Sequence, residues 1–169
     1  MDHRFRRTIA SFLAAAACAV VSAACGAFQN PFTPSTVSAG STDLVADAGY
    51  CVDEINRLRS TVGAQALSSS DDVQAFSNEA ARVDGDAHEV HKYFRETGGN
   101  GVSRAENEIP WWSLGQWGSV RAIIKQGLAK EWAEGPGGGH YDNMTAGYQV
   151  VACGISIKNG EVTITQDFR

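Results

Sequence analysis

Apolar side chains recur at helical spacing in three separate segments of the chain. Residues 51–62, 70–83 and 119–134 each place apolar positions three or four residues apart, which is typical of a helix with one buried face. Gly63 follows the first segment and Gly135 follows the third, at positions where helices commonly end. The pattern therefore predicts three helices over these ranges.

The spacing of apolar positions changes from helical to alternating near the C-terminus. Between residues 148 and 168 apolar and polar positions alternate, and Asn159-Gly160 in the middle is a common two-residue hairpin turn. One face of the first expected strand carries Val151, Cys153, Ile155 and Ile157. Helices followed by a hairpin predict the α+β class, with helices packed against an antiparallel sheet. No single period fits residues 85–118, to which we assign no element.

The N-terminus has the features of an export signal. Three arginines within the first seven residues precede a charge-free apolar run from Ile9 to Ala24, which is short for a membrane-spanning helix. We expect residues 1–24 to be a signal peptide. Residues 25–48, rich in Ser, Thr, Pro and Gly, are expected to form a flexible tether, and residues 49–169 a single domain.

The end of the apolar run allows two interpretations. In the first, Cys25 is the acylated first residue of a lipoprotein, and the lipid anchors the protein to a membrane of the cell envelope. In the second, an ordinary signal peptidase cleaves after the small residues and the protein is secreted. We favour the lipoprotein, because "SAAC" ends the apolar run and a spacer-like segment follows it.

Two cysteines remain for the folded domain. Cys18 lies within the expected signal and Cys25 is the lipidation candidate, which leaves Cys51 and Cys153 in a compartment that permits disulfides. A bridge between them would close a loop of roughly 100 residues and stabilise the fold by up to about 4–5 kcal/mol in the chain-entropy model. The alternative is two buried free thiols.

The charge of the chain excludes some partners. It carries 14 basic and 19 acidic residues, a formal net charge of −5, and removal of the signal would take away three of the arginines and one aspartate. We therefore expect no binding to nucleic acid or to an anionic lipid surface.

Known catalytic motifs do not match this chain. The string "HEVH" at residues 88–91 is one residue shorter than the zinc-peptidase motif HExxH, so its glutamate is not placed as a general base. The sequence contains no G-x-S-x-G nucleophile motif. The glycine-rich "GPGGGH" at residues 135–140 follows a predicted helix, and we expect no helix to begin behind it, hence no phosphate-binding loop.

The order of several short motifs resembles the CAP superfamily, which comprises cysteine-rich secretory, antigen 5 and pathogenesis-related 1 proteins. The matching pieces are "EINRLRSTVGAQAL", "AENE", "EWAEGP", "GGHYDNM" and "VACGI", in this order within residues 49–169. The resemblance implies an αβα sandwich, with helices packed around a small antiparallel sheet.

The resemblance also implies a metal-binding cleft made of two histidines and two glutamates. Carried over to this chain, the set is His91, Glu106, Glu134 and His140. His88 is the alternative to His91, and Glu131 is the alternative to Glu134. Such a set of imidazoles and carboxylates suits Zn²⁺. We expect the glycines before His140 to turn the chain so that its imidazole faces the last glutamate of the preceding helix.

We interpret the sequence as an exported CAP domain without enzymatic activity. It would act through its His/Glu cleft on a divalent metal, a small or lipid ligand, or an unidentified partner in the envelope or outside the cell. Two alternatives remain open at this point. One is a metal-dependent hydrolase that uses the same cleft, and the other is a structural or adhesion module of the envelope.

Overall fold

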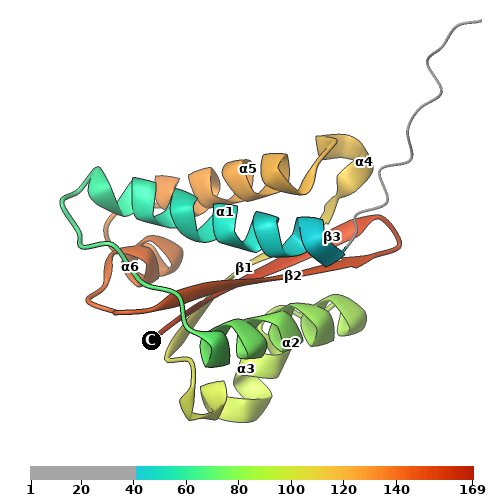
Figure 1. Cartoon of the computed structure of the whole chain (residues 1–169), viewed down its shortest axis with the longest axis horizontal. Helices are drawn as coiled ribbons and strands as arrows, with labels where there is room; N and C mark the ends of the chain where they lie inside the picture. The colour runs from blue at the N-terminus through green and yellow to red at the C-terminus, as the bar shows by residue number, and fades with distance from the viewer. Residues whose placement is uncertain (1–40) are drawn as a thin grey trace, which may run out of the picture. The chain divides into compact units, whose positions relative to one another are not determined.

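A three-stranded antiparallel sheet separates two helical layers in residues 41–169, which are the residues that the computed structural model describes (Figure 1). The strand order is β1-β3-β2, so β3 is central and β1 and β2 are edges. The strands are β1 (Ala105–Ser113), β2 (Val151–Lys158) and β3 (Glu161–Phe168). One layer holds α1 (Ser41–Ser60), α5 (Val120–Ala133) and α6 (Gly139–Thr145), and the other α2 (Asp71–Ala87) and α3 (Lys92–Thr97). Short turns η1 (Gly98–Gly101) and α4 (Leu114–Trp117) flank β1.

The sheet face toward α1 and α5 is apolar. Alternate residues of β3 point to this side, where Val162, Ile164 and Phe168 are fully buried. They pack with the apolar faces of the helices, which carry Ile55, Leu58, Ile123, Ile124 and Leu128. This layer forms the hydrophobic core that the helical periodicity predicted.

The opposite sheet face, toward α2, is buried but polar. The Ser77 hydroxyl lies 3.0 Å from the Thr165 hydroxyl and accepts the backbone N–H of Gly154 at 2.7 Å. A Cβ at position 154 would lie 1.9 Å from the Ser77 carbonyl oxygen, so α2 approaches β2 this closely only because residue 154 is glycine. Hydrogen bonds are therefore part of the contact between α2 and the sheet, beside the buried apolar side chains of α2.

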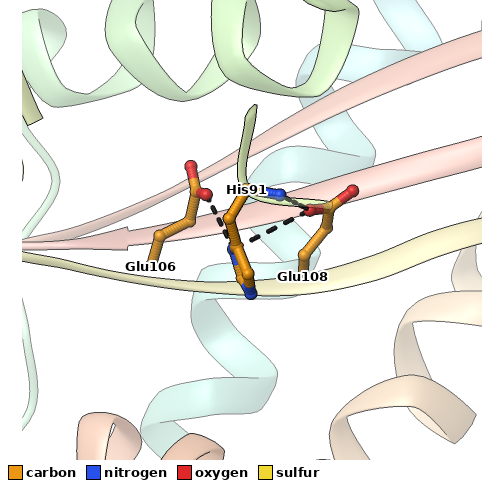
Figure 2. Close-up of side chains that lie close together, drawn as sticks. All are labelled: His91, Glu106 and Glu108. Atoms are coloured by element: carbon orange, nitrogen blue, oxygen red, sulfur yellow. Dashed lines mark hydrogen bonds and ion pairs between the residues drawn. The ribbon is translucent and has the colours of Figure 1, made fainter. Parts of the chain in front are cut away.

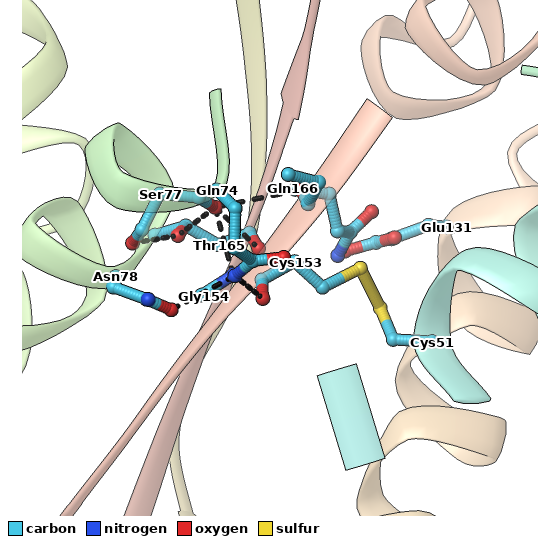
Figure 3. The surroundings of a disulfide bond; sticks show 10 residues. Cys51, Gln74, Ser77, Asn78, Glu131, Cys153, Gly154, Thr165 and Gln166 are labelled. Atoms are coloured by element: carbon cyan, nitrogen blue, oxygen red, sulfur yellow. Dashed lines mark hydrogen bonds between the residues drawn. A yellow bond between two sulfur atoms is a disulfide. The ribbon is translucent and has the colours of Figure 1, made fainter. Parts of the chain in front are cut away.

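A disulfide bond joins Cys51 of α1 to Cys153 of β2, as the sequence predicted (Figure 3). Both cysteines are fully buried within the apolar layer. The bond links two elements separated by 102 residues in the sequence and attaches the first helix to the C-terminal hairpin.

The three predicted helices and the hairpin are confirmed, with shifted ends. α1 begins at Ser41, so residues 41–48 belong to this helix and not to a flexible tether. The turn between β2 and β3 lies at residues 159–160 as expected. The expected signal peptide, Cys25 and the rest of the expected tether lie outside the described residues. No helix within the described residues is both long enough and apolar enough to span a membrane.

The expectation that no helix follows the glycine-rich segment is wrong. Gly135 and Gly137 adopt positive φ angles of 69° and 92°, which reverse the chain after α5. The backbone N–H of Gly137 then donates to the side chain of Asp142 at 3.0 Å. The short helix α6 begins immediately afterwards, at Gly139.

Candidate metal centre

Edge strand β1 places two glutamates on one face of the sheet. Glu106 and Glu108 are two residues apart and therefore point to the same side, the side of α2 and α3. Asn107 points to the opposite side, where its amide donates to the carbonyl oxygen of His140 at 3.1 Å. The side chains of both glutamates are almost fully buried, with exposed fractions of 1% and 0%.

The connection between α2 and α3 brings His91 onto these two glutamates (Figure 2). Its ring Nδ1 lies 2.9 Å from Glu106 Oε1 and 3.8 Å from Glu108 Oε2, and its backbone N–H donates to Glu108 Oε2 at 2.7 Å. His91 has a φ of 55°, so the chain reverses at this residue. Asp84 of α2 holds the reversal in place, because its Oδ1 accepts the backbone N–H of Tyr93 at 2.8 Å.

His91, Glu106 and Glu108 together could hold a metal ion. Each offers one ligand atom, and these atoms lie within 4.8 Å of one another. Burial, followed by the nearby Asp84, raises the pKa of Glu106 to about 8. Burial likewise raises the pKa of Glu108 to about 7, against the hydrogen bond from His91. A cation would favour the charged form of both carboxyl groups and offset the cost of burying them.

A second histidine–glutamate pair lies at the C-terminal end of α5. His140 Nδ1 is 2.5 Å from Glu134 Oε1, and the backbone N–H of His140 donates to Glu134 Oε2 at 3.1 Å. The hydrogen bond from His140 lowers the pKa of Glu134. Both side chains are about one-third exposed, with fractions of 36% and 35%. The glycine-rich segment directs His140 toward Glu134, in agreement with the sequence-based expectation.

A cleft of about 170 Å³ lies beside β1, and neither His91 nor Glu106 is among the residues that line it. His140, Glu134 and Glu108 all line it, so Glu108 belongs to the cleft and also contacts His91. The other lining residues are Ile109, Pro110, Trp112, Gly127, Lys130 and Glu131. The four residues carried over from the family pattern are therefore arranged as two pairs, His91–Glu106 and His140–Glu134, and the group of ligand atoms within 4.8 Å of one another contains His91, Glu106 and Glu108 without His140 or Glu134.

Both alternative residues have other contacts. Glu131 is 5% exposed and accepts a hydrogen bond from Gln166 Nε2 at 3.0 Å, and burial raises its pKa to about 7 (Figure 3). It lines the cleft, but Glu134 is the glutamate that contacts His140. His88 lies against Glu161, with Nε2 2.9 Å from Oε2, and its ring stacks on Trp111. His91 is thus the histidine that contacts Glu106.

Glu108 was not among the residues that the sequence suggested. It lies two positions after Glu106, and in a strand this spacing puts both carboxyl groups on one face. The spacing could have indicated Glu108 if residues 105–113 had been recognised as a strand.

Comparison with known proteins finds a matching family. Residues 52–168 match the profile of the family described as "Cysteine-rich secretory protein family" (CAP). A search of curated proteins finds no significant match.

Two solved bacterial structures resemble the chain at 11% sequence identity, and at this level the first of them shows the fold alone. One is a cysteine-rich secretory protein from Staphylococcus aureus subsp. aureus Mu50, with a TM-score of 0.51 over 77% of this chain and 40% of that chain. The other is an extracellular protein containing a SCP domain from Bacillus anthracis str. Ames, with a TM-score of 0.49 over 83% of this chain and 45% of that chain. The chain thus spans less than half the length of either structure.

Proposed function

The chain belongs to the cysteine-rich secretory protein (CAP) family, and from this premise we propose that it is an exported, non-enzymatic domain that binds Zn²⁺ in the cleft beside β1. The observation that carries the proposal is the contact of His91 Nδ1 with Glu106 Oε1 at 2.9 Å. A carboxylate oxygen of Glu108 lies within 4.8 Å of the ligand atoms of both residues. Imidazole combined with carboxylate favours Zn²⁺ over Ca²⁺ or Mg²⁺.

The residues beside β1 fit a cation in a second respect. Glu106 Oε2 and Glu108 Oε1 are buried and have no hydrogen-bond partner among the described residues. A buried carboxylate oxygen without a partner is costly, and a nearby cation lowers this cost. His91, Glu106 and Glu108 would hold the ion, and His140 and Glu134, which line a cleft together with Glu108, would offer further donor groups beside it. A bound Zn²⁺ would supply a positive charge that can hold an anionic or carbonyl-bearing ligand in the cleft.

Export is supported by three independent features. The disulfide between Cys51 and Cys153 is typical of an oxidising compartment. The structural relative from Staphylococcus aureus is described as a cysteine-rich secretory protein. Residues 1–24 have the pattern of a signal peptide, and Cys25 is the candidate for a lipid anchor. The ligand in the cleft would then come from the envelope or from outside the cell.

A metal-dependent hydrolase is the second candidate, because of Glu131. This carboxyl group lines the cleft, and burial raises its pKa to about 7. A group that titrates near neutral pH can exchange a proton with a substrate, whereas Glu134 in the same cleft stays ionised. Turnover of any ester, amide or glycoside substrate that is lost in both Glu131→Gln and zinc-free protein would favour the hydrolase.

Calorimetric titration of zinc into the purified protein tests the proposal. We expect Glu106→Gln and His140→Ala each to weaken zinc binding by at least about tenfold. His88→Ala is the matched control, because His88 contacts Glu161 outside the cleft, and it should bind zinc like the wild type. Equal zinc affinity in Glu106→Gln and the wild type would refute a metal site at this position.

A further inference from the structure

Asn107 of β1 lies between the two glutamates of the strand and points away from them, toward α6. Successive side chains of a strand leave opposite faces of the sheet, so Glu106 and Glu108 reach His91 on one face. On the other face Asn107 reaches the helix that carries His140. The Asn107 side chain is fully buried. Three consecutive residues of one strand therefore contact both histidines of the candidate site.

Both hydrogen-bonding groups of the Asn107 amide are used by α6. Its Nδ2 donates to the backbone carbonyl oxygen of His140 at 3.1 Å, and its Oδ1 accepts from Asn143 Nδ2 at 2.9 Å. A carbonyl oxygen can only accept, so the NH₂ group must face His140 and the orientation of the amide is fixed. Asn107 thus holds the residue that carries the imidazole, and not only the helix around it.

The C-terminal end of α6 is anchored independently of Asn107. The buried guanidinium of Arg59 in α1 donates to the carbonyl oxygens of Met144 and Ala146, at the end of the helix. Met144 is itself fully buried in the hydrophobic core. Loss of the Asn107 side chain should therefore leave this end of α6 attached and release mainly its first turn, where His140 lies.

The other contacts of the first turn of α6 do not reach the sheet. Glu134 accepts the backbone N–H of His140, but it lies at the end of α5 and is one-third exposed. Asp142 accepts the backbone N–H of Gly137 within the same segment of the chain. Among the hydrogen bonds of residues 41–169, only those of Asn107 join α6 to β1. The position of His140 relative to β1 therefore depends on this one side chain.

We propose that Asn107 is a positioning residue, which sets the place of His140 relative to His91, Glu106 and Glu108. The inference rests on the proposed function, in which His140 contributes to zinc binding. Asn107 would not touch the ion, because its side chain lies on the other face of the strand and is occupied by α6. Partners that orient metal-binding groups in this way typically account for about 10- to 100-fold in metal affinity.

A double-mutant cycle tests whether Asn107 acts through His140. Asn107→Ala should weaken zinc binding by at least about tenfold in the wild type, but by less than about twofold when His140→Ala is already present. Asn107→Leu, which also lacks hydrogen-bonding groups, replaces Asn107→Ala if that variant does not fold. Asn143→Ala is the matched control. It removes the other hydrogen bond of the Asn107 amide and leaves the bond to His140, so it should bind zinc like the wild type.

Three results of this cycle would overturn the proposal. One is an unchanged zinc affinity in Asn107→Ala. Another is an equal loss from Asn107→Ala with and without His140→Ala, because Asn107 would then act on the fold in general. The third is a loss in Asn143→Ala as large as that in Asn107→Ala, because the attachment of α6 as a whole would then matter and not the bond to His140.

A metal-free structure separates this proposal from the proposed function. In crystals of Asn107→Ala grown in EDTA, His140 should lie farther from Glu108 than in the wild type, by more than two wild-type crystals differ. His91 should remain in contact with Glu106, because that contact is on the other face of the strand. An unchanged position of His140 would overturn the role of Asn107 whether or not the wild type binds zinc. A displaced His140 together with a wild type that binds no zinc would refute the proposed function and support the positioning role.

Discussion

His140 contacts Glu134 across a glycine-rich turn of five residues, with Nδ1 2.5 Å from Oε1. Glu134 caps the end of α5 and His140 lies in the first turn of α6, so the turn between the two helices sets the geometry of the pair. Gly138 is the tightest point, because a Cβ there would lie 2.4 Å from the Glu134 Cβ. The pair therefore depends on a backbone path that a side chain at position 138 would block.

Gly138→Ala should weaken zinc binding without unfolding the protein. The added methyl group would displace the Glu134 side chain and separate it from His140. Gly139→Ala is the matched control at the next position, where a Cβ meets no atom within 4 Å and should leave zinc affinity unchanged. Calorimetric titration of both variants, with circular dichroism to check folding, makes the comparison. Similar zinc affinities in the two variants would contradict the role of the turn.

Gly127→Ala should destabilise the fold by about 1–3 kcal/mol. Its Cβ would lie 2.2 Å from the Ile109 Cδ1, so α5 and β1 would have to move apart. Gly49→Ala changes a glycine of α1 where an added methyl group meets no atom within 4 Å, and it should instead stabilise the protein slightly, because alanine favours helices. Urea unfolding of both variants measures the difference. The double variant Gly127→Ala with Ile109→Ala should recover part of the loss, and no recovery would mean that Ile109 is not the cause.

Removal of the disulfide should lower the free energy of unfolding by up to about 4–5 kcal/mol. The double variant Cys51→Ser with Cys153→Ser frees a loop of 102 residues in the unfolded chain, which gains conformational entropy. Denaturant unfolding of the double variant and of the oxidised wild type gives the value. Mass spectrometry of the unreduced wild type provides the control, since alkylation of both cysteines without reductant would show that the bond does not form.

The metal-free protein should lose stability as the pH rises from about 6 to about 8.5. Burial raises the pKa of Glu106 and of Asp167 to about 8, well above their ordinary values. The folded state keeps these protons in a range where the unfolded state has released them, so the stabilisation is complete in acid and is lost as the pH approaches 8. Thermal unfolding in EDTA at both pH values measures the loss.

Asp167→Asn should show a smaller loss over this pH range, because it removes one of the buried titrating groups. Asp86→Asn, an exposed aspartate of α2, should lose as much as the wild type. A wild-type unfolding temperature that stays constant or increases across this range would argue against buried, protonated carboxyl groups.

The helical layers were predictable from the sequence because their buried faces are apolar. Ile55, Ile123 and Leu128 recur at the helical period and all lie in the hydrophobic core. The hairpin was predictable for a similar reason. Apolar and polar residues alternate on both sides of Asn159-Gly160, and this dipeptide is a common hairpin turn.

Strand β1 was missed because consecutive residues on both of its faces are buried and most of them are polar. Glu106 and Glu108 are buried without being apolar, so residues 105–109 do not show the alternation of a half-buried strand. Helix α6 was missed because it has only seven residues and follows a glycine-rich turn, in which no Ser, Thr, Asp or Asn marks the start of a helix.

The candidate site was only partly predictable. Motif order indicated His91 and Glu106, and the structure places them in contact. The position of Asp167 beside Glu106 depends on how β3 pairs with β1. This pairing follows from strand register, which residue spacing in the sequence does not encode.

The location of a bound zinc ion tests the central claim most directly. Anomalous difference maps recorded at the zinc absorption edge, from crystals of the protein grown with zinc, would locate the ion without reference to any assumed ligand. The account predicts a single strong peak about 2.0–2.1 Å from His91 Nδ1, with a carboxylate oxygen of Glu106 at a similar distance. A peak bound elsewhere, or no peak beside β1 at saturating zinc, would contradict it.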